Sequence, residues 1–238
     1  MIPDDGRTDT SAVFFDVDGT LTKTTIVHHY VYFRRRMMSP LVGRIWYALF
    51  LVKCLYYLVL DRIDRSLLNI VFYRSYAGLH AEYIKNQATD CHRAIILPRQ
   101  FEQVAGCVEQ HRAAGHTIVL VTGSLDFIIE PFARALAVDA VVAPSLVESN
   151  GRFTGKLNGP PIGDKEKARR ITQFAENHGI DLSRSHAYGD SIADLPMLEC
   201  VGHAHVVNPD RRLAGVAQRN GWSTHHWTVK GSNKMNNR

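Results

Sequence analysis

The spacing of apolar and polar positions changes repeatedly along this chain between a strand-like and a helix-like pattern. Predicted strands and helices therefore alternate over most of its length. The first predicted strand, at 12–16, begins with a short, uninterrupted apolar run at 12–15, as in a buried strand. Similar runs predict further strands at 117–121, 140–142, 185–188, 203–207 and 222–227. Helical patterns lie between them, at 99–114, 124–136, 164–178, 193–200 and 209–219. This alternation predicts an α/β fold with a Rossmann-like, doubly wound parallel sheet.

Two segments depart from the simple alternation. Asn150-Gly151 stands between short apolar runs, and this dipeptide suits the two-residue turn of a hairpin. Between 23 and 95 the pattern is helical, although a parallel crossover needs only one helix. We therefore expect an inserted all-helical cap over 23–95 and an α/β core made of 10–22 and 96–228. The polar ends, 1–9 and 229–238, are expected to be flexible.

One predicted helix of the cap, at 45–60, is unusually apolar, with Lys53 near its middle. Three interpretations stay open. The helix could be buried in a four-helix cap, or lie on a membrane surface with its apolar side in lipid. It could also span the bilayer, where Lys53 would cost about 2.5 to 3.5 kcal/mol. Arginines stand around it at Arg34, Arg35, Arg36, Arg44, Arg62 and Arg65.

Charge and cysteine content restrict the choice of partners. The chain has 28 Lys and Arg against 23 Asp and Glu, a net charge of +5. This excess suits solvated surface residues or an anionic partner, such as a phosphorylated substrate or an anionic lipid surface. There is no arginine-rich tract with interleaved aromatic residues, so nucleic acid is not expected. Four dispersed cysteines and an acidic start indicate a cytoplasmic location, in solution or at the membrane; the oligomeric state stays open.

Two carboxylates follow the first predicted strand. Asp16 and Asp18 stand one residue apart, directly before Gly19-Thr20. Neighbouring carboxylates raise each other's cost of ionisation unless a cation or a proton lies between them. In an open α/β sheet, ligands bind beyond the carboxyl ends of the strands. The pair therefore predicts a metal site with a chemical role.

Three further segments are expected near the same edge of the sheet. Thr122-Gly123-Ser124 follows the second core strand, Gly189-Asp190 and Asp194 follow the fourth, and Lys167 opens the helix between them. Each segment alone is a common turn or surface pattern. Together they offer a nucleophile, hydroxyl and amide donors, a cation and ligands for Mg²⁺, which are the needs of phosphoryl transfer.

In this order the motifs resemble those of the haloacid-dehalogenase superfamily, and in particular its subfamily IB, the phosphoserine-phosphatase-like branch. The runs at 188–198 and 207–210 are typical of that branch. The resemblance covers 12–22 and 97–228, and extends to the cap by position and helical character only. It implies a phosphatase, a Mg²⁺-dependent phosphomonoester hydrolase that acts through an aspartyl-phosphate intermediate.

The resemblance also implies a role for each matching acid. Asp16 would attack phosphorus, and Asp18 would protonate the leaving oxygen and later deprotonate a water. The Asp16 carboxylate, the Asp18 backbone carbonyl and Asp190 would hold Mg²⁺. Asp194 would be a further ligand or an outer-shell residue that orients the others.

The remaining matches would bind the phosphoryl group. Thr122 and the Gly123 amide would donate hydrogen bonds to its oxygens, and Lys167 would neutralise charge on the nucleophile and the phosphate. Lys165 is the alternative lysine. Lys167 is favoured because apolar residues four and seven positions later give its helix a buried face.

The substrate is expected to be a small organic phosphate or a lipid-like phosphate. Phosphoserine phosphatases of this branch carry a glutamate nine residues after the nucleophile, where this chain has Thr25. No carboxylate occurs between Asp18 and Asp61, so a substrate ammonium group would lack a partner there. A membrane-surface helix at 45–60 would favour a lipid-like ester. Two rival functions stay open: a phosphotransferase with the same intermediate, and a non-catalytic membrane-surface protein that keeps the fold.

Overall fold

The computed structural model describes residues 10–63 and 65–229, and its core is a parallel sheet of six strands. The strands occur in the order β3-β2-β1-β6-β7-β8. Their bounds are β1 (Ala12–Phe15), β2 (Thr117–Val121), β3 (Ala140–Val142), β6 (His186–Gly189), β7 (His203–Val207) and β8 (Ser223–His225). β1 lies between β2 and β6 and pairs with both in parallel. The predicted α/β fold class is confirmed.

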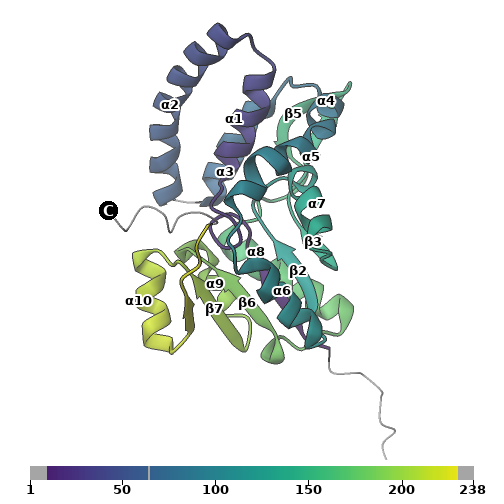
Figure 1. Ribbon diagram of the computed structural model, residues 1–238, viewed down its shortest axis with the longest axis vertical. Coiled ribbons are helices and arrows are strands. Elements are labelled where there is room, and N and C mark those ends of the chain that lie inside the picture. Colours follow the sequence, from purple (N-terminus) through teal and green to yellow (C-terminus); the bar gives the residue numbers. More distant parts are fainter. Residues whose placement is uncertain (1–9, 64, 230–238) are drawn as a thin grey trace, which may run out of the picture.

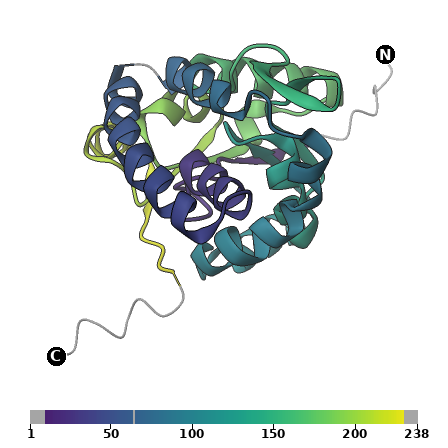
Figure 2. The same cartoon turned by 90° about the horizontal axis from the view of Figure 1, so that it is seen from above.

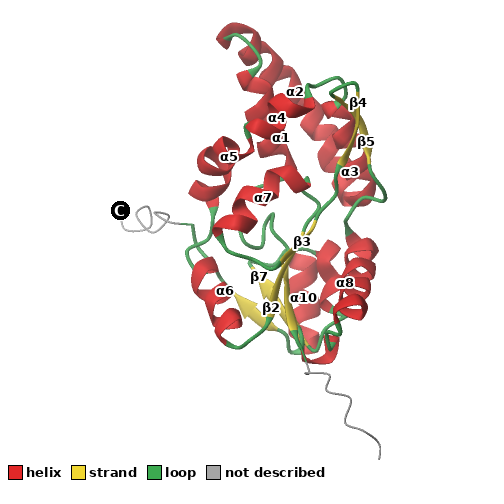
Figure 3. Ribbon diagram, turned by 90° about the vertical axis from the view of Figure 1, so that its right-hand side faces the viewer, coloured by secondary structure: helices red, strands yellow, loops and turns green. Residues whose placement is uncertain are grey.

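The central strand shows how the sequence produces two layers of helices. Val13 and Phe15 of β1 pack on one face of the sheet, and Ala12 and Phe14 on the other, because side chains alternate along a strand. Both faces are covered, which explains the uninterrupted apolar run. The first face carries α6 (Val104–Ala113) and α7 (Asp126–Ala135). The second carries α8 (Asp164–His178), α9 (Leu195–Leu198) and α10 (Arg211–Asn220), and Figure 3 shows helices on both sides of the strands.

Residues 26–99, which lie between β1 and β2 and precede α6, are largely helical and lie mainly in the upper half of the molecule in Figure 1. The helices of this segment are α1 (Ile26–Arg36), α2 (Pro40–Ile63), α3 (Arg65–Tyr73), α4 (Ala81–Asn86) and α5 (Ala88–Cys91). Short helical turns complete it at Arg74–Tyr76, His92–Ile96 and Leu97–Arg99. The exact division into a cap at 23–95 and a core stays a prediction.

The predicted hairpin is present and packs against this helical segment. It consists of β4 (Leu146–Ser149) and β5 (Arg152–Leu157), joined by Asn150 and Gly151 with φ of 49° and 72°. The Phe153 N–H donates to the Leu79 carbonyl at 2.9 Å. The predicted core range therefore contributes a hairpin that extends the cap.

The first core helix and the chain ends differ from expectation. The helix predicted at 99–114 begins only at Val104, because the Phe101 N–H donates to the Leu21 carbonyl at 3.1 Å and Gln100 bridges to Thr22. Residues 1–9 and 230–238, predicted to be flexible, lie outside the described part. Val229, the first residue of that predicted tail, forms a bridge with Phe101.

α2 is not the buried cap helix that the first interpretation predicts. A narrow stripe, with Phe50 and Tyr57 buried and Trp46 half-buried, packs toward α1 and α3. Over Pro40–Leu60 the helix is long and apolar enough to cross a membrane, yet only 17% of this stretch is buried. Figures 1 and 2 show α2 on the outside of the cap. Eleven large apolar side chains are exposed and are called here the outer face of α2: Leu41, Val42, Ile45, Tyr47, Leu49, Leu51, Val52, Leu55, Tyr56, Leu58 and Val59.

Candidate active site

A buried lysine joins the acids at the carboxyl end of the sheet. Asp16 directly follows β1, and Lys167 lies in the first turn of α8. The Lys167 Nζ lies 2.5 Å from Asp16 Oδ1 and 2.6 Å from Asp194 Oδ1. Lys167 is 6% exposed, whereas Lys165 is on the exposed side of the helix. The structure thus places Lys167, and not Lys165, against Asp16.

Burial and charge act in opposite directions on this group. Burial raises the pKa of the Asp16 carboxyl to about 6, although the Lys167 ammonium lowers it. Burial lowers the pKa of Lys167, but the charges of Asp16 and Asp194 outweigh this effect and raise it overall. The lysine therefore stays charged, and it compensates two buried carboxylates.

Two hydroxyl groups orient the carboxylate of Asp18. Thr24 Oγ1 donates to Asp18 Oδ1 at 2.6 Å, and Ser124 Oγ donates to Oδ2 at 2.5 Å. Both donors are buried, with 3% and 1% exposure. The sequence pattern indicates Ser124 only as part of a turn and assigns no role to Thr24. The available signal was the unusual run of threonines at 20, 22, 24 and 25.

The loops after β1 and β6 meet at Asp190. Thr20 Oγ1 donates to Asp16 Oδ2 at 2.9 Å and lies 3.3 Å from Asp190 Oδ1. Gly19 has a φ of +98°, and a Cβ at this position would collide with the Asp190 carboxylate. Glycine therefore permits the close approach of the two loops. Thr20, which stands directly after Gly19 in the first motif, is a further site residue to which the sequence pattern assigns no role.

The acids offer oxygen ligands for a hard cation. Carboxylate oxygens of Asp16, Asp190 and Asp194 lie within 4.8 Å of one another. An all-oxygen set of this kind fits Mg²⁺. Asp194 also accepts from Lys167 and from the backbone N–H groups of Asp190 and Ser191, both at 3.2 Å. These bonds connect Asp194 to the lysine and to the loop that carries Asp190, which suits an orienting role.

The loop after β2 meets the cap directly. Thr122 is buried, and its Oγ1 accepts from the Ser124 N–H at 3.0 Å. The Tyr73 hydroxyl of α3 donates to the Gly123 carbonyl at 2.6 Å. A Cβ on Gly123 would lie 3.1 Å from Asn69 Nδ2. The cap is thus in contact with the loop that is expected to bind the phosphoryl group.

A pocket of about 390 Å³ connects these groups where the cap meets the core. All seven predicted site residues line it: Asp16, Asp18, Thr122, Gly123, Lys167, Asp190 and Asp194. The cap supplies mainly apolar residues, namely Ile26, Val27, Cys54, Tyr57, Leu58 and Leu68. Thr25 also lines the pocket, as does Asp164 at the start of α8. One end of the pocket is therefore acidic and polar, and the cap side is largely apolar.

Comparison with known proteins agrees with this arrangement. Residues 13–199 match the family model of haloacid dehalogenase-like hydrolases. The chain is 32% identical over 217 residues to a probable phosphatase of Mycobacterium tuberculosis, covering 89% of this chain and 74% of the relative. It is 28% identical over 229 residues to a phosphoserine phosphatase of the same species, covering 92% and 72%. A solved structure of a Bordetella pertussis protein of unknown function is similar, with a TM-score of 0.78, 25% identity and coverage of 92% and 99%. The chain belongs to the haloacid dehalogenase-like hydrolase family.

Proposed function

We propose that this protein is a Mg²⁺-dependent phosphomonoester hydrolase with Asp16 as nucleophile. The observation that carries the proposal is the buried contact between Lys167 and Asp16 in a pocket that also contains Asp18 and Asp190. Membership of a hydrolase family and similarity to proteins named phosphatases support it. The complete set of catalytic side chains argues against a non-catalytic protein that merely keeps the fold.

In the first step a carboxylate oxygen of Asp16 attacks phosphorus. A bond forms between this oxygen and phosphorus, and the bond to the ester oxygen breaks. Asp18, in its protonated form, donates its proton to the departing ester oxygen. Thr20 and Lys167 hold the nucleophile, and Lys167 offsets negative charge that gathers around it.

In the second step a water molecule attacks the phosphorus of the aspartyl-phosphate. Asp18, now a carboxylate, accepts a proton from this water, so that phosphate leaves and Asp16 is regenerated. The hydroxyls of Thr24 and Ser124 keep Asp18 in one orientation through both steps. Thr122 and the Gly123 amide would donate to the phosphoryl oxygens.

Three of the acidic residues would hold the cation. We assign the Asp16 carboxylate, the Asp18 backbone carbonyl and Asp190 as Mg²⁺ ligands, with Asp194 orienting them through Lys167 and the loop amides. When bound, Mg²⁺ supplies positive charge that neutralises the phosphoryl oxygens.

The cap side of the pocket indicates the class of the ester. Its lining residues from α1, α2 and α3 are mainly apolar. Thr25 occupies the position where an acid would accompany an amino-acid substrate, and its hydroxyl lies 2.9 Å from His28 Nδ1. An apolar or amphiphilic leaving group therefore fits this pocket better than the ammonium and carboxylate of phosphoserine.

A phosphate-release assay tests this function. The panel contains nitrophenyl phosphate, an alkyl phosphate, lysophosphatidate, phosphocholine, histidinol phosphate and phosphoserine, with and without Mg²⁺. We expect Mg²⁺-dependent release that favours the apolar esters and is lost in Asp16→Asn. Glu109→Gln, which alters an exposed carboxylate on α6, is the matched control. No release from any ester would contradict the function, preference for phosphoserine would contradict the substrate class, and transfer to an added alcohol instead of water would identify a phosphotransferase.

A further inference from the structure

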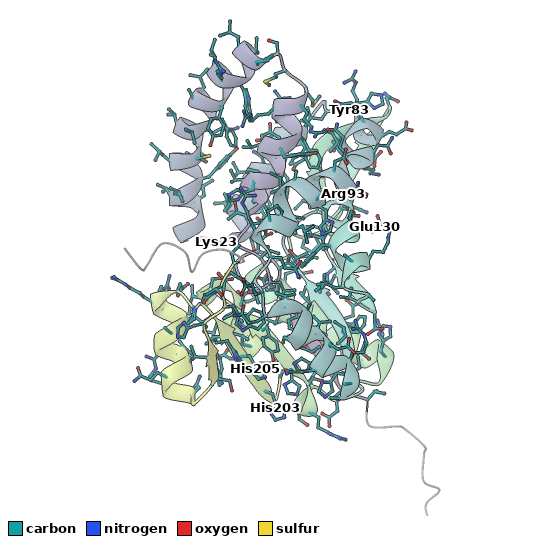
Figure 4. The ribbon with its side chains drawn as sticks, in the orientation of Figure 1. Lys23, Tyr83, Arg93, Glu130, His203 and His205 are labelled. Carbon is teal, nitrogen blue, oxygen red and sulfur yellow. The ribbon has the colours of Figure 1, made fainter. Side chains whose placement is uncertain are left out.

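The outer face of α2 is a large apolar surface that no described part of the chain covers. Leu41, Leu49, Val52 and Leu55 are each 65% to 68% exposed. A helix that is apolar on all sides is normally buried, and exposed apolar patches of this extent mark interaction sites. Figure 4 shows side chains of α2 that project away from the rest of the molecule.

A groove of about 650 Å³ lies beside this surface, between α1 and α2. No aspartate or glutamate among the described residues lines it. Four arginines do so: Arg35, Arg36, Arg44 and Arg99. Apolar residues of both helices, such as Val31, Phe50 and Leu51, form the rest of its wall. Arg36 also lies 3.8 Å from Asp90, in a pair that is about half exposed. The groove suits a ligand that is anionic at one end and apolar at the other.

Arginine and aromatic side chains are combined at the tip of the cap. The Arg34 guanidinium lies over the Trp46 ring at 5.5 Å, and that of Arg35 over the Tyr47 ring at 6.0 Å. Long basic side chains and amphipathic rings are typical of the headgroup region of a bilayer, where the stems face lipid and the charges face water. Basic charge beside the outer face of α2 is therefore complementary to an anionic membrane.

The outer face of α2 could also be covered by a second copy of the chain, or α2 could span a bilayer. Both arrangements fit these observations less well than contact with a membrane surface. In a two-fold dimer the same patch would face itself, so that the arginines of one copy would approach those of the other. A membrane-spanning α2 would have to leave its packing in the cap, where Tyr30 contacts Phe50 at a ring distance of 5.6 Å. It would also carry Lys53 into the bilayer. A helix that lies along the membrane surface keeps both the cap packing and the hydration of Lys53.

We propose that the outer face of α2 and the adjacent basic groove dock this protein on an anionic lipid bilayer, and that its phosphate ester enters from that bilayer. The second half of this inference rests on the proposed function. Tyr57 and Leu58 of α2 line the active-site pocket, and Val27 and Cys54 line both this pocket and the groove. An ester can thus place its phosphate at Asp16 while its apolar part stays against α2.

Vesicle flotation of the purified full chain tests the docking. Vesicles of phosphatidylcholine alone are compared with vesicles that also contain phosphatidylglycerol, at low and high salt. We expect flotation with the anionic vesicles only, and its loss at high salt because screening weakens the attraction. Combined replacement Leu49→Gln, Val52→Gln and Leu55→Gln, or Arg35→Gln with Arg44→Gln, should weaken binding by about tenfold or more. Tyr83→Gln, which changes an exposed aromatic residue on α4, is the matched control, and circular dichroism verifies that each variant is folded.

Each of the following results would contradict docking on an anionic bilayer. Equal flotation with neutral vesicles, or unchanged binding of both sets of variants, would exclude it. A stable dimer in light scattering without flotation would identify a second copy as the occupant. Resistance to extraction by alkaline carbonate would identify a spanning helix.

The two proposals can fail separately. Flotation requires no turnover, so Asp16→Asn should float like the wild type. Flotation without phosphate release would refute the proposed function, whereas release from soluble esters without flotation would refute the docking. Release from a lysophosphatidate in anionic vesicles that is no faster than from the same ester in neutral vesicles would refute entry from the bilayer.

Discussion

Ser124 donates a hydrogen bond to Asp18, with 2.5 Å between the two oxygens, although the residues stand 106 positions apart. The bond links the loop after β2 to the loop after β1. Thr24 makes the equivalent bond to the other carboxylate oxygen. The pair fixes the direction in which Asp18 can deliver or accept a proton.

Removal of the Ser124 hydroxyl should therefore impair proton transfer. For Ser124→Ala we expect kcat to fall about tenfold, with little change in KM. This loss is only part of the rate enhancement that proton transfer by Asp18 provides. The loss should be larger for an alkyl phosphate than for nitrophenyl phosphate, because a poor leaving group depends more on the proton from Asp18. Steady-state kinetics on both esters measure this. Ser145→Ala, which changes a half-buried serine that does not line the pocket, is the control. Both esters share the second step, in which Asp18 activates water, so equal losses would assign the defect to that step. An unchanged kcat on both esters would contradict the positioning role.

Replacement of Lys167 should reduce stability as well as activity. Lys167→Met leaves Asp16 and Asp194 as buried carboxylates without their cation, at a cost of about 3 to 5 kcal/mol. Lys165→Met removes an exposed charge and should stay within about 0.5 kcal/mol of the wild type. Urea unfolding without Mg²⁺ compares the two variants. Similar unfolding free energies would mean that Lys167 is not the compensating charge.

Gly19 should be required for the approach of Asp190. In Gly19→Ala the new Cβ adds a collision with the Asp190 carboxylate to the strain of a φ of +98°. Gly78→Ala carries similar strain, with a φ of +78°, but its Cβ meets nothing within 4 Å. We expect the Mg²⁺ concentration for half-maximal activity to rise at least about tenfold in Gly19→Ala and to stay unchanged in Gly78→Ala. If this Mg²⁺ concentration rose equally in the two variants, backbone strain would explain the rise, and the collision with Asp190 would not.

A histidine network should make the fold sensitive to acid. His205 and His203 lie at the end of the molecule away from the cap (Figure 4). His205 Nε2 lies 3.0 Å from His186 Nδ1, and His111 Nε2 lies 2.9 Å from the Tyr188 hydroxyl. Burial, together with neighbouring histidines, lowers the pKa of His111 and His186 to about 4 and that of His205 to about 3.

The lowered pKa values of these histidines determine how the stability of the fold changes with pH. Between the unfolded pKa of about 6.5 and the folded values, the unfolded chain binds more protons than the folded chain. The contribution of these groups to stability is therefore complete above about pH 6.5 and is lost as the pH falls toward 4. Urea unfolding across this range should show the decline, and His205→Gln should make it shallower. A decline of the same slope in the variant would assign it to other groups.

The sheet and the main site residues could be predicted because their signals are local. An apolar run followed by Asp16 and Asp18 indicates both a buried strand and a chemical site at its end. The buried face of α8 similarly distinguished Lys167 from Lys165. Such patterns depend on a few neighbouring positions, and the rules of parallel sheets then bring the strand ends together.

Other features depend on partners that no local pattern names. The bond of Ser124 to Asp18 requires the meeting of distant loops, and that of Thr24 depends on how the loop after β1 turns back on itself. Hydroxyl residues are common in any turn, so neither bond is visible in the local sequence. The exposure of α2 depends on how many helices surround it, which its own apolar composition does not reveal. The late start of α6 likewise follows from the pairing of Phe101 with Leu21, a contact between remote segments.

Transfer of the phosphoryl group to Asp16 can be measured most directly by mass spectrometry of the quenched enzyme. Asp18→Asn should still attack nitrophenyl phosphate, whose leaving group needs no proton, but it should be slow to activate the water. The variant, mixed with this ester and Mg²⁺ and quenched in acid, is therefore expected to carry one phosphoryl group on the peptide that contains Asp16. An unmodified peptide during turnover, or a phosphoryl group on another residue, would contradict nucleophilic catalysis by Asp16.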